Sequence, residues 1–317
     1  MSFPVFDLHC DTVLGVMGHD LSATGSLRKN DLHIDLERGK TLPGYVQCFA
    51  CFTTTAEELP AGRTVEDVFE RELSVLLREF DANKDILKQA FTADDIEENI
   101  RDGFISGVLT IEGPAGFGFD PALLENLYQI GFRMTTLGWN EKNVLCGSNV
   151  TGGGLTDLGK EYVKEAQRLG MIVDVSHISD EAFWDIMDIT GAPVIASHSN
   201  SRAVLDVSRN LMDDMFKAIC ETGGVAGFNL WTEFIGGKRD LDASCDHILH
   251  FMELDPQGKH IALGGDLDGC DPLPAGFSGI QDYPRLADKL LERGVDPSIV
   301  KNVFFNNALG VMKKCCI

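Results

Sequence analysis

Short apolar runs recur along this chain, and stretches with helical periodicity separate them. Runs of this length, rich in β-branched residues and bounded by Gly or Pro, are typical of buried strands. Eight of them begin at Val5, Gly44, Gly107, Phe132, Ile172, Val194, Gly224 and Ile261. The helices predicted between them include residues 65–80, 157–169, 180–190, 213–222 and 241–253. Eight alternating units of strand and helix favour a closed (β/α)8 TIM-type barrel, with a doubly wound open sheet as the alternative.

The length of the chain is compatible with one such barrel. At 317 residues, and with no repeat or interdomain linker, the chain is expected to form a single domain over residues 1–317. Two long loops, 14–42 and 270–283, are expected at the carboxyl ends of the strands, where they would wall a pocket. A C-terminal helix is expected over 296–314, with Pro297 in its first turn.

The charge balance excludes several kinds of partner. With 27 basic and 49 acidic residues, the net charge of −22 would repel nucleic acid and anionic membrane surfaces. No apolar stretch approaches the roughly 20 residues of a membrane span. The N-terminus lacks the basic and apolar regions of a signal peptide. We therefore expect a cytoplasmic protein without membrane or nucleic-acid partners, and the sequence leaves a homodimer open.

The nine cysteines are irregularly spaced. Cys48 and Cys51 form a CxxC pair, but they lie inside an apolar segment that is expected to be a strand. No second pair completes a zinc ribbon, and a redox motif would be expected where a strand meets a helix. Buried, reduced thiols are the expectation.

Side chains able to bind a metal follow four of the predicted strands. They are His9, Asp11, Glu112, His177 and His198. The carboxyl ends of the strands of a parallel barrel meet at one mouth, so these side chains can converge. Each alone has an ordinary structural explanation, but together they indicate a metal centre. Three imidazoles and two carboxylates suit zinc, with manganese, iron or cobalt as alternatives.

Further side chains near the ends of the predicted strands could take part in hydrolysis at such a centre. Asp266 closes the last apolar run and can serve as general base, later returning the proton to a leaving amine. Asp268 could share this role or brace the loop. Arg209 follows the sixth run and could clamp a substrate carboxylate, with a surface salt bridge as its alternative role and Arg202 as a competitor.

Six motifs in chain order resemble the membrane (renal) dipeptidase family, peptidase family M19. They are DLHCDT at 7–12, TIEG at 110–113, DVSH at 174–177, ASHS at 196–199, SRN at 208–210 and GGDLDG at 264–269. The resemblance implies an amidohydrolase-type barrel with two zinc ions, for which manganese or cobalt could substitute. It further implies that a metal-bridging hydroxide hydrolyses dipeptides, including those with a C-terminal D-residue.

The resemblance also implies roles for the site residues. His9 and Asp11 would hold one zinc, His177 and His198 the other, and Glu112 would bridge them. Asp266 would transfer the proton, and Arg209, with Asn210 beside it, would bind the substrate.

Two tryptophans depart from the family's pattern. Trp139 stands where the mammalian relatives carry a substrate-contacting His, and an indole can donate a hydrogen bond but cannot titrate. Trp231 stands where a substrate-lining Tyr is expected. Both are candidate substrate-binding residues. Their departure from the family's pattern is expected to affect the range of substrates more than the chemistry of hydrolysis. The alternatives to a dipeptidase are a related metal-dependent hydrolase of N-acyl amino acids or lactones, and a non-catalytic small-molecule-binding relative.

Overall fold

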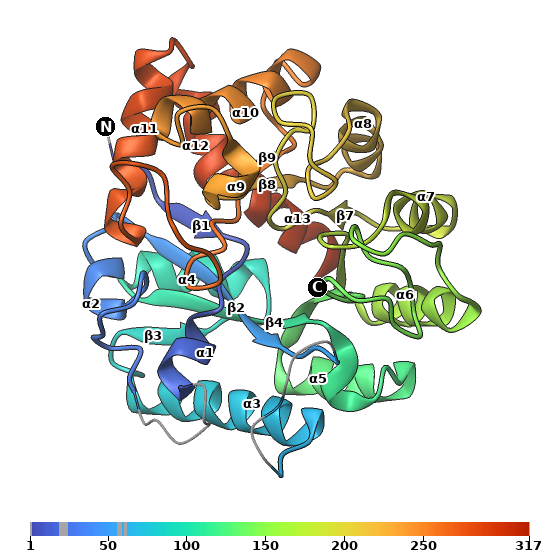
Figure 1. The fold of residues 1–317 in the computed structure, drawn as a ribbon. Coiled ribbons are helices and arrows are strands. Elements are labelled where there is room, and N and C mark those ends of the chain that lie inside the picture. Colours follow the sequence, from blue (N-terminus) through green and yellow to red (C-terminus); the bar gives the residue numbers. More distant parts are fainter. Residues whose placement is uncertain (1, 19–24, 56–58, 60–61, 317) are drawn as a thin grey trace.

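Eight parallel strands form the barrel in the computed structural model of Figure 1, which describes residues 2–18, 25–55, 59 and 62–316. Around the sheet their order is β7-β6-β5-β4-β2-β1-β9-β8. The strands are β1 (Val5–Asp7), β2 (Tyr45–Phe52), β4 (Ile105–Glu112), β5 (Phe132–Thr136), β6 (Ile172–Asp174), β7 (Val194–Ile195), β8 (Ala226–Phe228) and β9 (Ile261–Leu263). Every predicted starting point lies within two residues of an observed one.

The barrel closes between β7 and β8 through a single bridge. Ala196 pairs with Ala226, and the amide of Gly227 donates to the carbonyl of Ala196 at 2.7 Å. Only glycine fits at position 227, because a Cβ there would lie 1.9 Å from the carbonyl oxygen of Ser197. This closure confirms the barrel and rules out the open doubly wound sheet.

Helices surround the strands (Figure 1). The five predicted ones appear as α3 (Val65–Ala82), α6 (Asp157–Leu169), α7 (Asp180–Ile189), α8 (Asp213–Thr222) and α10 (Leu241–Leu254). The side chains of Thr64, Thr156, Ser179 and Asp240 cap four of these at their first turns. Further helices and 3-10 turns are α1 (Thr12–Met17), α2 (Leu36–Gly39), α4 (Ala93–Arg101), η1 (Pro114–Phe117), η2 (Pro121–Leu123), α5 (Leu124–Ile130), α9 (Thr232–Ile235), η3 (Ile280–Asp282) and α11 (Tyr283–Glu292). A short strand, β3 (Leu87–Gln89), pairs with β4 outside the main strand order.

The C-terminal stretch is helical but not uniform. It divides into α12 (Pro297–Lys301), a π-helical turn η4 (Asn302–Asn306) and α13 (Asn307–Cys315). Val303, Phe304 and Phe305 are all buried. Three consecutive side chains can point inward more easily from the wider π turn than from a regular α-helix.

The long loop 14–42 contains the end of α1 and all of α2. Its first part lines the pocket at the carboxyl ends of the strands, whereas α2 packs beside Tyr45 and Ile105, the first residues of β2 and β4, at the opposite end of the barrel. Residues 19–24 of this loop are outside the described part of the chain. Among the described residues, no helix combines the length and the apolar character needed to cross a bilayer.

Candidate metal centre

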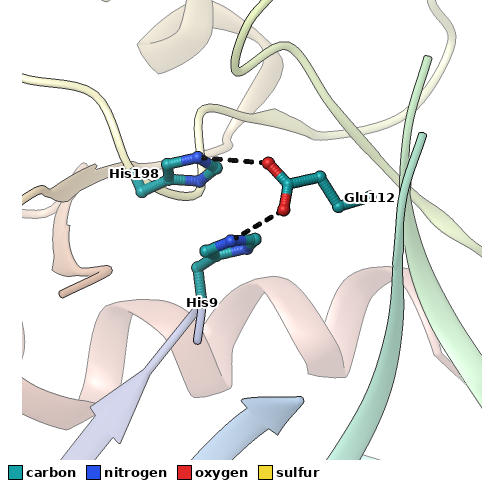
Figure 2. A group of neighbouring side chains, drawn as sticks. All are labelled: His9, Glu112 and His198. Atoms are coloured by element: carbon teal, nitrogen blue, oxygen red, sulfur yellow. Dashed lines mark ion pairs between the residues drawn. The ribbon is translucent and has the colours of Figure 1, made fainter. Parts of the chain in front are cut away.

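The five predicted ligands come together at the carboxyl ends of the strands. Glu112 Oε2 lies 3.2 Å from His9 Nε2, and Glu112 Oε1 lies 3.0 Å from His177 Nε2 and 3.8 Å from His198 Nε2. Asp11 Oδ2 is 3.5 Å from His9 Nε2. Figure 2 shows the Glu112 carboxylate directed toward the rings of His9 and His198. The two oxygens of Glu112 thus face two separate groups of donors.

Neighbouring side chains fix the tautomers of two histidines. His177 Nδ1 lies 3.1 Å from Asn140 Oδ1, an oxygen that only accepts, so the proton is on Nδ1. His198 Nδ1 lies 2.6 Å from Ser197 Oγ, whose hydroxyl donates to Asp174. His198 Nδ1 is therefore also a donor, and the Nε2 atoms of both rings carry lone pairs. These two atoms face each other across 2.9 Å.

The donor set fits a metal ion. Lone pairs so close together repel, and a cation beside both nitrogens removes that repulsion. His9 Nε2 and Asp11 Oδ1 are buried and have no hydrogen-bond partner among the described residues. Two overlapping groups bring three ligand atoms within 4.8 Å of one another: His9, Glu112 and His198, and His9, Asp11 and Asp266.

Burial governs the electrostatics of this cluster, since the five ligands are only 1% to 8% exposed. Burial lowers the pKa of His177 and of His198 well below the usual value, so both rings are neutral, as metal ligands must be. Burial also raises the pKa of Glu112 to about 7. For His9, burial lowers the pKa, but the charges of Glu112 and Asp11 outweigh it and raise the pKa well above the usual value. The carboxylates thus attract positive charge, which a divalent cation would supply in place of a proton on His9.

Asp266 faces the cluster from the end of β9. Its Oδ1 lies 3.9 Å from His9 Nε2, and its Oδ2 accepts a hydrogen bond of 3.0 Å from Asn229 Nδ2. Burial raises the pKa of Asp266 to about 6. A carboxyl group with such a pKa can take up and return a proton near neutral pH.

Asp268 belongs to a different network. It accepts hydrogen bonds from the Thr12 hydroxyl at 2.5 Å and from the His33 amide at 2.6 Å. Its own amide donates to His33 Nδ1 at 3.0 Å. Of the two roles that the sequence left open for Asp268, these contacts support bracing of the loop.

Arg209 is buried but only partly paired. Its Nη1 donates to Ser199 Oγ at 2.6 Å, whereas Nε and Nη2 have no partner among the described residues. Such an unpaired guanidinium edge can bind a carboxylate through two hydrogen bonds. Arg202 is already engaged, because it donates to both carboxylate oxygens of Asp180 at 2.7 and 2.8 Å.

Asn210 lies apart from the cluster. Its Nδ2 donates to the backbone carbonyls of Leu205 and Phe234, each at 3.0 Å. These bonds tie the β7–α8 connection to the short helix α9. The side chain therefore holds the segment that carries Arg209.

A cavity of about 1010 Å³ opens above the cluster. Trp139 and Trp231 both line it. The Trp139 ring packs edge-on against Phe52 at 5.2 Å, and the Trp231 indole donates to the backbone carbonyl of Asp271 at 3.1 Å. The loop 14–42 contributes to the lining, whereas Asp271, in the loop 270–283, supports Trp231.

Several residues that orient the site were not among the sequence candidates. They are Asn140, Asp174, Ser197 and Asn229. Asn229 directly follows β8, so the strand-end position that singled out the ligands could also have indicated it. Asn140 lies in an irregular loop, where asparagine is common for local reasons and gives no signal.

Known proteins resemble this chain over its length. The family model for membrane dipeptidase (peptidase family M19) matches residues 1–316. An uncharacterized dipeptidase of Schizosaccharomyces pombe is 36% identical over 216 residues, which are 66% of this chain and 53% of that protein. This match thus spans about half the length of that relative.

Two solved structures share the barrel. One is described as the dipeptidase AC, a metallo peptidase of family M19, with a TM-score of 0.88, 26% identity and coverage of 100% of this chain and 99% of that one. The other is a metallo peptidase from Rhodobacter sphaeroides liganded with a phosphinate mimic of the dipeptide L-Ala-D-Ala. It has a TM-score of 0.87, 24% identity and coverage of 99% and 100%. Family and fold agree on a dipeptide-hydrolysing metalloenzyme, as expected from the sequence. The chain therefore belongs to the membrane dipeptidase family, peptidase family M19.

Proposed function

We propose that this protein is a zinc-dependent dipeptidase that cleaves the amide bond of dipeptides, including those with a C-terminal D-residue. The observation that carries the proposal is the position of Glu112, whose oxygens face His9 on one side and His177 and His198 on the other. These nitrogen and oxygen donors suit two zinc ions, with manganese or cobalt as substitutes. When bound, the ions would activate a water molecule and polarise the substrate carbonyl.

The chain's own residues position the substrate and move the proton. The unpaired edge of Arg209 would bind the C-terminal carboxylate of the dipeptide. Asp266, with one oxygen held by Asn229, would accept a proton and return it to the leaving amine. Trp139 and Trp231 would contact the substrate from the cavity wall.

A substrate panel combined with metal analysis tests this function. Purified protein should release free amino acids from dipeptides, lose this activity after exhaustive chelation and regain it with zinc. The panel includes L,L and L,D dipeptides, because the Rhodobacter sphaeroides relative binds a mimic of L-Ala-D-Ala. No turnover of any dipeptide with zinc, manganese or cobalt would contradict the proposal. Turnover of N-acyl amino acids or lactones alone would identify the related hydrolase instead.

We also propose that the enzyme works in the cytoplasm. Eight of its nine cysteines are buried as free thiols, a pattern that suits a reducing compartment. Cell fractionation with an antibody against the native protein checks this location, and recovery in a membrane or secreted fraction would contradict it.

A further inference from the structure

One side of the cavity is apolar. At about 1010 Å³, the cavity is at the upper end of the roughly 300–1,000 Å³ typical of pockets for drug-sized ligands. The smallest dipeptides do not need that space. The side distant from Arg209 is lined by Leu14, Met17, Leu32, Phe52, Val65 and Val68, which we call the apolar wall.

The apolar wall is built from segments that follow two adjacent strands. Leu14 and Met17 lie on α1, after β1, and Phe52 ends β2. Val65 and Val68 are three residues apart in the first turns of α3, so they share one helix face. The two helices are neighbours in the lower part of Figure 1. Leu32 packs directly on α1, because a Cβ at Gly15 would lie 2.6 Å from Leu32 Cδ1.

The apolar wall and Arg209 lie on opposite sides of the barrel mouth. In the closed order β7-β6-β5-β4-β2-β1-β9-β8, β2 is four positions from β7 in either direction. Arg209 lies on the connection from β7 to α8, and the ligand cluster occupies the space between. A dipeptide with its carboxylate on Arg209 and its amide over the cluster therefore extends its N-terminal residue toward β2.

We propose that the apolar wall binds the side chain of the N-terminal residue, so that the enzyme prefers dipeptides that begin with a large apolar residue. This inference rests on the proposed dipeptidase function. The composition of the wall supports it, because none of its six side chains carries a charge or a hydrogen-bonding group. An acidic N-terminal side chain would lose its hydration there without gaining a partner.

A dipeptide series with alanine fixed at the C-terminal position tests the preference. We expect kcat/KM for Leu-Ala and Phe-Ala to exceed that for Gly-Ala by about tenfold or more, as apolar pockets discriminate side chains. Glu-Ala should be the poorest substrate. Equal values for Gly-Ala and Leu-Ala, or a preference for Glu-Ala, would overturn the inference and leave the dipeptidase function intact. No turnover of any member would overturn both.

A charge placed on the apolar wall should change the specificity. In Val68→Arg, the ratio of kcat/KM for Leu-Ala to that for Glu-Ala should fall at least tenfold, because the wall then attracts a carboxylate. Leu77→Arg is the matched control: it adds the same charge to the same helix at a site that is 40% exposed and outside the cavity lining, so the ratio should not change.

A milder variant guards against misfolding. If circular dichroism shows that Val68→Arg is unfolded, Val68→Thr replaces a methyl group by a hydroxyl of similar size and should lower the same ratio severalfold. An unchanged ratio in a folded Val68 variant would overturn the inference.

Discussion

At the scale of single residues, the centre is held in a conformation that proteins usually avoid. His177, Asp266 and Asp268 have φ values of 71°, 56° and 69°, in the left-handed region that favours glycine. Such backbone strain costs of the order of 1–3 kcal/mol per residue and persists only where surrounding contacts enforce it. Here Asn140 holds His177, Asn229 holds Asp266, and Thr12 and His33 hold Asp268.

Replacing Asp266 by Asn tests its role in proton transfer. The amide cannot accept a proton as the carboxylate does, so kcat should fall by roughly 10²–10⁴-fold. The five ligands proposed for the metals remain, and plasma emission spectrometry should still find two ions per chain. Loss of metal together with activity would instead show that Asp266 is itself a ligand.

At the scale of elements, much of this fold was predictable because the barrel strands are buried on both faces. Burial on both faces gives near-continuous apolar runs, which marked all eight strands. The helix α4 was not predicted, since its sequence ADDIEENIR offers only two large apolar residues. The strand β3, LKQ, is too short to show a period. The π-helical turn could not be predicted from the sequence. It depends on whether Val303, Phe304 and Phe305 all pack in the core, which only the folded structure shows.

The convergence of the five candidate ligands was predictable for the same reason as the strands, because each follows an apolar run. The sequence could not show that the two oxygens of Glu112 face different histidines, since this depends on side-chain directions that only the closed barrel fixes. Likewise, the sequence could not show that the Asn210 amide faces backbone carbonyls.

The connection from β7 to α8 should depend on Asn210. In Asn210→Ala the carbonyls of Leu205 and Phe234 each lose one of two donors, since the Val207 amide and Asn200 Nδ2 still reach them, and the protein should be destabilised by about 1 kcal/mol. Because Arg209 is then less well placed, KM for dipeptides should rise more than kcat falls. Steady-state kinetics and urea unfolding check both effects. A fall in kcat alone would contradict this positioning role.

The helix α10 carries a buried histidine that should make stability depend on pH. His247 Nε2 donates to the carbonyl of Ile235 at 3.0 Å, and Nδ1 accepts from the Ser201 amide at 3.2 Å. Burial lowers the pKa of His247 in the folded protein, so the unfolded chain binds the proton first as pH falls below about 6.5. The free energy of unfolding is therefore smaller in acid than at neutral pH.

Urea unfolding at pH 7.5 and 5.5 measures this contribution. Gln can make both hydrogen bonds without titrating, so His247→Gln should lose less stability in acid than the unsubstituted protein. The other histidines are unchanged and serve as an internal control. Equal losses in the two proteins would show that His247 does not contribute.

At the scale of the whole molecule, the metal ions should contribute to stability as well as to activity. The chain has a net charge of −22 and collects buried carboxylates at one end of the barrel. Bound cations would offset that charge only in the folded state, because the ligands converge from strands that are distant in sequence.

Removing the metal should therefore lower the melting temperature. Ligand at 100 times its Kd stabilises a folded protein by about 2.7 kcal/mol, which corresponds to several degrees for a chain of this size. Scanning calorimetry before and after chelation, and again after zinc is restored, measures the change. Glu112→Gln should respond less to zinc, and a full response in that variant would contradict the bridging role.

The metal centre lies beside the single bridge between β7 and β8 and would contribute to the closure of the barrel. This is the junction where the cylinder is completed, and the chain just beyond β7 carries His198 while β8 leads to Asn229. Separation of β7 from β8 would move His198 away from His9. Metal ions held between these two histidines would therefore oppose that separation, so that the centre proposed for hydrolysis would also stabilise the closed barrel.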